Sequence, residues 1–229
     1  MQLAIIVPCF NEAGNIFSFY QTLNRVPVEI AKIIFVDDGS SDNTREKIAQ
    51  LNDPRVQCLA IRHCGKERAL LHGINHALSA GTPLIATIDV DGQDPPELLP
   101  KLANAIKRGK CELAATRRRS RKNEPFLKRA LAGTAYFLAP FICGISLVNG
   151  ARDYCVMTRQ VAQKIATLSN SKNLFLKGQI QAMQFKTRWL TFDYRSRKNG
   201  KSKWSFWQLL IYTLRGALVT RQQRKISRE

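Results

Sequence analysis

The chain has 229 residues, of which 45% are hydrophobic, and a formal net charge of +19 at pH 7. That length can bury one good core, so we expect a single domain with an appendage. The six cysteines form no Cys-x-x-Cys pair, and the N-terminus has the pattern of a strand rather than of a signal peptide. These observations exclude a disulfide-rich secreted protein and predict reduced thiols in a cytosol.

The positive charge is concentrated in the second half of the chain. Residues 1–106 contain 9 Lys/Arg and 12 Asp/Glu, whereas residues 107–129 contain 10 against 2 and residues 186–229 contain 12 against 2. These basic blocks predict a polyanionic partner: nucleotide phosphates, an anionic membrane surface or nucleic acid. A basic nucleic-acid-binding protein is the remote alternative, because no RNP, zinc-finger or helix-turn-helix pattern accompanies the blocks.

Short apolar runs alternate with helical patterns over the first 116 residues. We expect strands at 3–7, 33–36, 56–61, 84–88 and 113–116, and helices at 13–24, 42–51, 66–80 and 95–107. Further along, residues 153–157 and 188–194 look extended and residues 160–168 look helical. The alternation predicts an α/β fold with a mostly parallel sheet and helices on both faces.

Three polar clusters follow the predicted strands, at residues 8–12, 37–42 and 89–94. In open sheets of this class, ligands bind beyond the carboxyl ends of the strands. The clusters therefore predict one site at that edge.

The third cluster has the composition of a metal site. Asp89, Asp91 and Gln93 are spaced two residues apart after an apolar strand, so their side chains can face one point. Their oxygens suit a hard ion, Mg²⁺ or Mn²⁺, that leaves positions for water and a substrate diphosphate. Two prolines follow, and Asp94 is the expected N-cap of the next helix. The alternative is an acidic turn before a helix.

The second half offers two membrane-related patterns. Residues 130–150 carry no charge, but glycines and a proline interrupt them, which favours buried or interfacial helices over a true membrane span. Residues 204–219 predict an amphipathic helix flanked by basic residues, which either lies in the headgroup region or docks on the core. We therefore expect a catalytic domain at 1–200 and a basic, membrane-interfacial helix within 201–229.

Two other motifs do not indicate a functional site. Gly65-Lys66-Glu67 is not a P-loop, because Ala60 stands where the first glycine is required and Glu67 replaces Ser/Thr. His72 and His76 have i,i+4 spacing without a third ligand, and we interpret them as helix-surface residues.

Several motifs together resemble those of a known family. They are PCFNE at 8–12, VDDGSSD at 36–42, GKE at 65–67, DVDGQDPPE at 89–97, GARDYCVMTR at 150–159, FLKG at 175–178 and RKNGKSKW at 197–204. The set resembles inverting glycosyltransferases of the GT-A fold, family 2, and most of all the polyprenyl-phosphate glycosyltransferases of the dolichol-phosphate mannose synthase type. The FLKG segment resembles a basic-glycine step before a helix. Many relatives continue into transmembrane helices, whereas this sequence ends at Glu229.

The resemblance implies a role for each matching residue. Asp89, Asp91 and Gln93 would bind the divalent ion, with Asp91 and Asp153 as the catalytic residues. The nucleotide sugar would be held by Pro8, Phe10, Glu12, Val36, Asp38, Asp89, Val90, Asp91, Gln93, Arg117, Arg118, Lys177, Arg197 and Lys203. Of the neighbouring arginines, Arg118 is the preferred phosphate contact.

The expected reaction is transfer of a sugar from a UDP- or GDP-sugar to undecaprenyl or dolichyl phosphate. A lipid phosphate has a second pKa of about 6 and is already a nucleophile, so cations matter more than a strong base. For a saccharide hydroxyl, the alternative acceptor, a base would be needed, and Asp153 is the candidate. We expect a cytoplasmic enzyme, peripheral on the inner membrane face, that binds no nucleic acid. Direct binding to lipid and recruitment by a separate membrane protein are the two ways in which it would reach the membrane.

Overall fold

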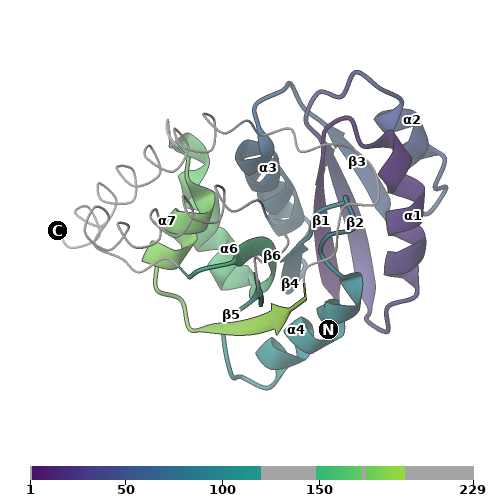
Figure 1. Ribbon diagram of the computed structural model, residues 1–229. Coiled ribbons are helices and arrows are strands. Elements are labelled where there is room, and N and C mark those ends of the chain that lie inside the picture. The colour runs from purple at the N-terminus through teal and green to yellow at the C-terminus, as the bar shows by residue number, and fades with distance from the viewer. Residues whose placement is uncertain (1, 120–147, 172–173, 194–229) are drawn as a thin grey trace, which may run out of the picture.

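The computed structural model describes residues 2–119, 148–171 and 174–193, and it has the predicted α/β architecture (Figure 1). The strands are β1 (Leu3–Cys9), β2 (Ile30–Asp37), β3 (Val56–Ala60), β4 (Leu84–Thr87), β5 (Leu113–Arg118), β6 (Ala151–Thr158) and β7 (Thr187–Phe192). All seven expected extended segments are confirmed, with shifted ends.

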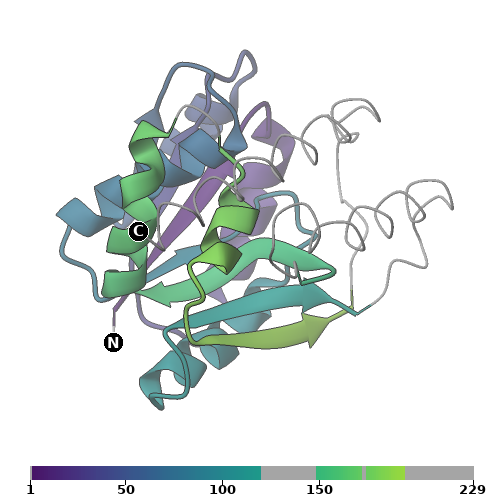
Figure 2. The ribbon, with the colours of Figure 1, turned by 90° about the vertical axis from the view of Figure 1, so that its left-hand side faces the viewer.

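Within the described residues these strands form one sheet in the order β3-β2-β1-β4-β6-β5-β7. Strand β6 is antiparallel to both β4 and β5, and the other neighbouring pairs are parallel. Figure 2 shows β7 at the outer edge of the sheet beside β5. The mostly parallel sheet is thus confirmed, and its one reversed strand is important for the site.

Helices cover both faces of the sheet, as predicted (Figure 1). They are α1 (Ala13–Asn24), α2 (Thr44–Ala49), α3 (Lys66–Ser79), α4 (Leu99–Lys107), α6 (Arg159–Ala166) and α7 (Leu176–Ala182), with 3₁₀ turns at Pro96–Leu98 and Thr167–Asn170. Helices α1, α2 and α4 enclose one apolar core and α3, α6 and α7 the other. Alternate residues of β1 supply both cores, with Ile5 on one face and Ile6 on the other.

Helix α3 packs unusually close to the sheet. A Cβ at Gly73 would lie 2.4 Å from Ile6 Cγ2 and 3.0 Å from Val36 Cγ2, so only glycine fits there without displacing the strands. The N-terminus of α3 follows the carboxyl end of β3, and the helix contacts β1 and β2. This packing holds Lys66, the first residue of α3, at the edge where the polar clusters were predicted.

Two local expectations are wrong. Asp94 is not a helix cap: Pro95 precedes the 3₁₀ turn, that turn has no side-chain cap, and the Asp94 carboxylate turns inward to Arg152. The Lys177-Gly178 step does not precede a helix but lies inside α7, which begins at Leu176.

Residues 120–147 and 194–229 fall outside the described residues, so most of the uncharged segment at 130–150 and the whole of the expected helix at 204–219 lie outside them. Among the helices that are described, none is long and apolar enough to cross a bilayer. The described cysteines, Cys9, Cys58, Cys64, Cys111 and Cys155, form no disulfide with one another.

Candidate active site

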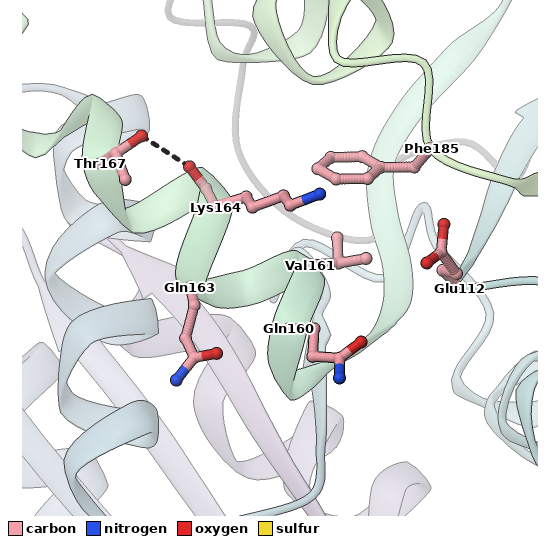
Figure 3. Close-up of a pocket in the computed structure, with 7 residues that line it drawn as sticks. All are labelled: Glu112, Gln160, Val161, Gln163, Lys164, Thr167 and Phe185. Carbon is pink, nitrogen blue, oxygen red and sulfur yellow. Dashed lines mark hydrogen bonds between the residues drawn. The ribbon is translucent and has the colours of Figure 1, made fainter.

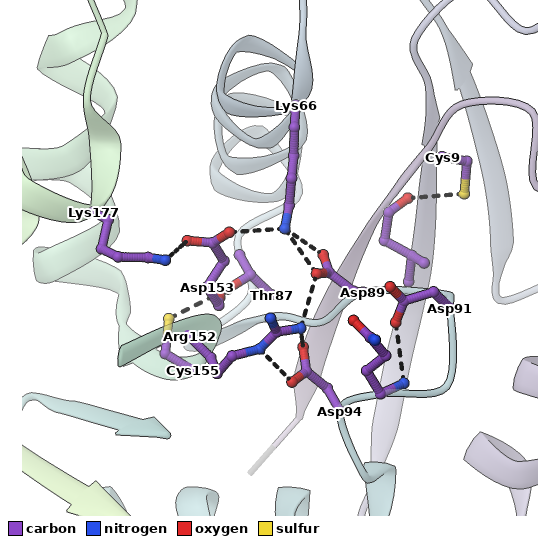
Figure 4. Close-up of polar contacts among 12 residues, drawn as sticks. Cys9, Lys66, Thr87, Asp89, Asp91, Asp94, Arg152, Asp153, Cys155 and Lys177 are labelled. Atoms are coloured by element: carbon purple, nitrogen blue, oxygen red, sulfur yellow. Dashed lines mark hydrogen bonds and ion pairs between the residues drawn. The ribbon is translucent and has the colours of Figure 1, made fainter. Parts of the chain in front are cut away.

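The candidate site lies at the carboxyl ends of β1, β2 and β4, where β6 begins (Figure 4). Because β6 runs antiparallel to β4, Cys155 pairs with Thr87, and the first residues of β6 lie beside the segment that follows β4. The Thr87 hydroxyl donates to the backbone carbonyl of Asp153 and fixes this junction. Asp89 and Asp153, which are 64 positions apart in the sequence, thereby face the same space.

Asp89 is held by two cations. Lys66 Nζ lies 2.7 Å from Asp89 Oδ1 and 2.8 Å from Oδ2, and Arg152 Nη2 lies 3.4 Å from Oδ2. The Asp89 side chain is 16% exposed, so part of the carboxylate remains open to a ligand.

Asp91 and Gln93 form a tight turn next to Asp89. The Gln93 backbone N–H donates to Asp91 Oδ1 at 3.0 Å, and both side chains are nearly buried. Gly92 between them has a φ of 76°, a conformation that favours glycine. The turn brings a second carboxylate and an amide to the end of β4, but not by the expected alternation along an extended segment, because β4 ends at Thr87 and these residues lie in a turn.

The donor set fits a hard divalent ion only if the amide takes part. In the described part of the chain, no group of three or more His, Cys, Asp and Glu side chains could hold a metal. Two carboxylates and the Gln93 amide oxygen remain, an all-oxygen set of the kind Mg²⁺ and Mn²⁺ take together with water and phosphate. The metal assignment of Asp89, Asp91 and Gln93 stays a prediction.

Asp153 lies between two lysines. Lys66 Nζ donates to Asp153 Oδ2 at 2.7 Å, and Lys177 Nζ lies 3.8 Å from Oδ1 (Figure 4). Burial alone would raise the pKa of Asp153, but Lys177, Lys66 and Arg152 outweigh it and hold the pKa well below its usual range. Burial would likewise lower the pKa of Lys66, but Asp153 and Asp89 raise it. The carboxylate is therefore ionised and a weak base.

A buried ion pair ties the acidic turn to β6. Arg152 Nε donates to Asp94 Oδ1 at 2.9 Å and Arg152 Nη2 to Oδ2 at 3.2 Å, in a two-pronged contact. The Asp94 side chain is 0% exposed and that of Arg152 14%. The Tyr154 hydroxyl adds a bond to the Pro95 carbonyl at 3.1 Å. These contacts fix the position of the turn that carries Asp91 and Gln93.

At the end of β2, the Asp38 carboxylate fixes the loop that leads from β3 into α3. It accepts hydrogen bonds from the backbone N–H groups of Cys64 at 2.7 Å and Gly65 at 2.9 Å. The ring of His63 stacks on Phe10 with centroids 4.4 Å apart. The backbone of His63 can come this close to residue 39 only because that residue is glycine. Gly39 has a φ of 73°, and a Cβ there would lie 2.9 Å from the backbone nitrogen of His63. An aromatic pair beside a buried carboxylate is a suitable surface for a nucleobase.

The four remaining uncharged or acidic residues predicted to bind the nucleotide fall into two groups. Pro8 and Glu12 are half-buried near this loop, and Glu12 accepts from Asn15 Nδ2 at 2.6 Å. Val36 and Val90 are buried at 0% and 3%, in opposite cores behind the site. Their contribution in the described structure is to packing, and contact with a donor stays a prediction.

Of the basic residues, only some can be placed. Arg117 is exposed and donates to Thr191 Oγ1 at 3.2 Å, whereas Arg118 is half-buried on the opposite face of β5. Whether either contacts phosphate stays a prediction. Arg197 and Lys203 lie outside the described residues.

Sequence reasoning gave no role in the site to three residues that the structure places there: Lys66, Arg152 and Asp94. Lys66 was set aside with the failed P-loop, although its position at a helix start after a strand put it at the correct edge. Asp94 was interpreted as a cap. Arg152 gave no usable signal, because only the antiparallel direction of β6 brings it to Asp94.

A separate hollow lies far from this site. It has a volume of about 410 Å³ and is lined by Glu112, Phe185 and one side of α6 (Figure 3). Glu112 precedes β5 and α6 follows β6, so the hollow lies at the opposite edge of the sheet. It does not belong to the predicted site.

Comparisons with known proteins agree with this geometry. The model of the glycosyl transferase family 2 matches residues 4–166. A bactoprenol glucosyl transferase of Shigella phage SfV is 34% identical over 94% of this chain and 71% of its own length. An uncharacterized glycosyltransferase of Synechocystis is 32% identical over 94% of this chain and 68% of its own.

Among solved structures, the fold is similar to that of glucosyl-3-phosphoglycerate synthase from Mycobacterium tuberculosis. In its complex with Mn²⁺, UDP-glucose and phosphoglyceric acid, that enzyme matches with a TM-score of 0.62 over 97% of this chain and 79% of its own, at 17% identity. At this identity the match shows a shared fold.

Proposed function

Because the chain belongs to glycosyl transferase family 2, we propose that it moves a sugar, with inversion, from a nucleotide sugar to a polyprenyl phosphate. Relatives named bactoprenol glucosyl transferases support this acceptor class. The structural observation that carries the proposal is the position of Asp153, ionised between Lys66 and Lys177.

The donor would bind along the carboxyl edge of the sheet. Phe10, His63 and Asp38 would hold the nucleoside, and the diphosphate would extend toward Asp89 and Asp91. Asp89, Asp91 and Gln93 would hold a divalent ion, Mg²⁺ or Mn²⁺, which when bound would neutralise charge on the leaving diphosphate. Lys66 contributes a fixed positive charge at the same place.

The acceptor is argued from the basicity of Asp153. A saccharide hydroxyl must lose its proton to a base as it attacks, and a carboxylate whose pKa is strongly lowered is poorly matched to that task. A lipid monophosphate has a second pKa of about 6 and attacks as an anion, so it needs cations to position it. Lys66, Lys177 and Arg152 provide them.

We place the reaction at the cytosolic face of a membrane, because a polyprenyl chain must stay in lipid. The basic residues in 186–229, most of which lie outside the described structure, would bind the anionic surface, and a separate membrane protein could share this task. Removing residues 204–229 should weaken binding to anionic liposomes relative to neutral ones. Unchanged binding would show that this segment does not contact the membrane.

The donor site is tested by a thermal-shift screen of UDP-, GDP- and dTDP-sugars with and without Mn²⁺ or Mg²⁺. One donor should raise the Tm only with the ion, and Asp91→Asn should abolish that shift. Asp193→Asn is the matched control, because Asp193 is exposed and pairs only with Arg119 among the contacts that the structure shows. An undiminished shift in Asp91→Asn would refute the metal assignment.

The acceptor is tested by product analysis. Wild-type protein, donor and ion are incubated with undecaprenyl or dolichyl phosphate, and separately with saccharide acceptors. We expect a glycosylated lipid phosphate. Transfer to a saccharide hydroxyl instead would favour the alternative, a transferase for surface polysaccharide or lipopolysaccharide.

A further inference from the structure

An apolar groove starts at Asp153 and follows α7. It has a volume of about 220 Å³ and is lined by Leu176, Lys177, Ile180 and Gln181 of α7 and by Gln184 just beyond it. The two pairs Leu176–Lys177 and Ile180–Gln181 are one helical turn apart and therefore lie on one face of the helix. At 1.5 Å per residue, that face is about 10 Å long.

The lining of the groove changes from charged to apolar along its length. At one end lie Arg152, Asp153 and Lys177, which belong to the active site. Beyond them most of the described lining is hydrocarbon, from Leu70 and Ile74 of α3, Leu113 and Ala115 of β5, Met157 of β6 and Trp189 of β7, whereas Gln181, Gln184 and Thr187 are polar. The Cys155 thiol also faces the groove, and burial raises its pKa to about 12, so it adds no charge.

We propose that this groove holds the first isoprene unit of a polyprenyl phosphate, with the phosphate beside Lys177. The proposal rests on the proposed function and adds to it the place where the lipid chain leaves the reaction centre. The sugar and the nucleotide are polar and match the acidic edge of the sheet, so the hydrocarbon next to the acceptor phosphate is the substrate part that fits these walls.

The charges at the mouth are arranged for an anionic head group. The 3.8 Å between Lys177 Nζ and Asp153 Oδ1 is an ion pair but is longer than a hydrogen bond, so the ammonium can turn to a phosphate at little cost. Lys177 and Ile180 are three residues apart on the same helix face, so one chain can contact both. Head group and hydrocarbon are therefore recognised by the same helix.

The experiment compares acceptor kinetics in variants of α7. Ile180→Trp fills the groove and Ile180→Ala removes part of its wall, whereas Ala182→Trp introduces the same indole side chain on the same helix at a position that does not line the groove. Farnesyl phosphate serves as the acceptor, and its binding is also measured by calorimetry. The donor-induced Tm shift reports whether each variant is folded and binds the donor.

We expect Ile180→Trp to raise the KM and Kd for farnesyl phosphate by about tenfold or more, since several buried carbons lose their contacts. Ile180→Ala should raise them less, Ala182→Trp should leave them unchanged, and the KM for the donor should not move in any of the three. A folded Ile180→Trp or Ile180→Ala with unchanged acceptor binding overturns the groove assignment and leaves the proposed function intact. If the wild-type protein itself transfers nothing to farnesyl or undecaprenyl phosphate, the proposed function fails and the groove assignment fails with it.

Discussion

Breaking the buried pair between Arg152 and Asp94 should have the largest effect of any single change at the site. Replacing Arg152 with methionine keeps most of the side-chain length but removes both hydrogen bonds, at 2.9 and 3.2 Å, to a carboxylate that is 0% exposed. Removing one partner of a buried pair costs about 3–5 kcal/mol, because the other charge is left uncompensated. A domain of ordinary stability has about 5–15 kcal/mol in total, so Arg152→Met should fold but unfold at much lower urea.

Two further variants separate this effect from a general loss of contacts. In the double variant Asp94→Leu with Arg152→Met, no charge is left buried, and we expect most of the lost stability to return. Arg119→Met is the matched control, because the Arg119–Asp193 pair is 66% and 76% exposed and 3.3 Å long. Exposed pairs contribute about 0–1 kcal/mol, so the control should barely change.

The assay is equilibrium urea unfolding of five proteins at pH 7, with stabilities compared at constant m-value: wild type, Arg152→Met, Asp94→Leu, the double variant and Arg119→Met. The reasoning would be refuted if Arg152→Met lost no more stability than Arg119→Met. It would also fail if the double variant were as unstable as the two single changes added together, because the two sites would then be uncoupled.

Three more changes have defined outcomes. Lys66→Met should lower kcat/KM by about a hundredfold, because it removes a fixed cation from Asp89 and Asp153, and steady-state kinetics should show it without loss of Tm. Gly39→Ala should destabilise the protein and weaken donor binding, because the φ is positive and the added Cβ meets the His63 backbone; equal thermal-shift curves would contradict this. Hydrogen bonds from Arg55 lower the pKa of Asp53, so this carboxylate stabilises the fold above the unfolded pKa of about 3.9 and loses the contribution as pH falls below it. Asp53→Asn should therefore be less stable than wild type at pH 7, and the difference should shrink steadily as the pH is lowered from 4 toward 2; a constant difference in urea unfolding would refute the linkage.

The first half of the fold could be predicted because each element carries its own signal. Strand β1 is a short apolar run ended by a polar cluster, and α3 has apolar residues at helical spacing, so hydrophobic period and turn chemistry give both type and order. The position of Asp89, Asp91 and Gln93 just after a strand followed from the same local rules, whereas the turn that they form replaces the alternation expected of an extended segment.

Contacts between distant segments could not be predicted in the same way. Asp94 before two prolines has the local pattern of a cap, and only the buried Arg152 across the sheet turns it inward. Lys66 reaches Asp89 and Asp153 because α3 packs against β1 through Gly73. These contacts depend on tertiary packing, so no local sequence pattern predicts them.

The direction of β6 explains how residues from distant segments of the chain come together at the site. A strand of eight residues spans about 25 Å, so a parallel β6 would place its first residues at the far edge of the sheet, where Glu112 lies. Running antiparallel, it brings Arg152 to Asp94 and Asp153 to Lys66, and the groove along α7 then opens directly beside Asp153. The turn that carries Asp91 and Gln93, the lysines and the apolar groove thus meet at one point because a single strand is reversed within an otherwise parallel sheet.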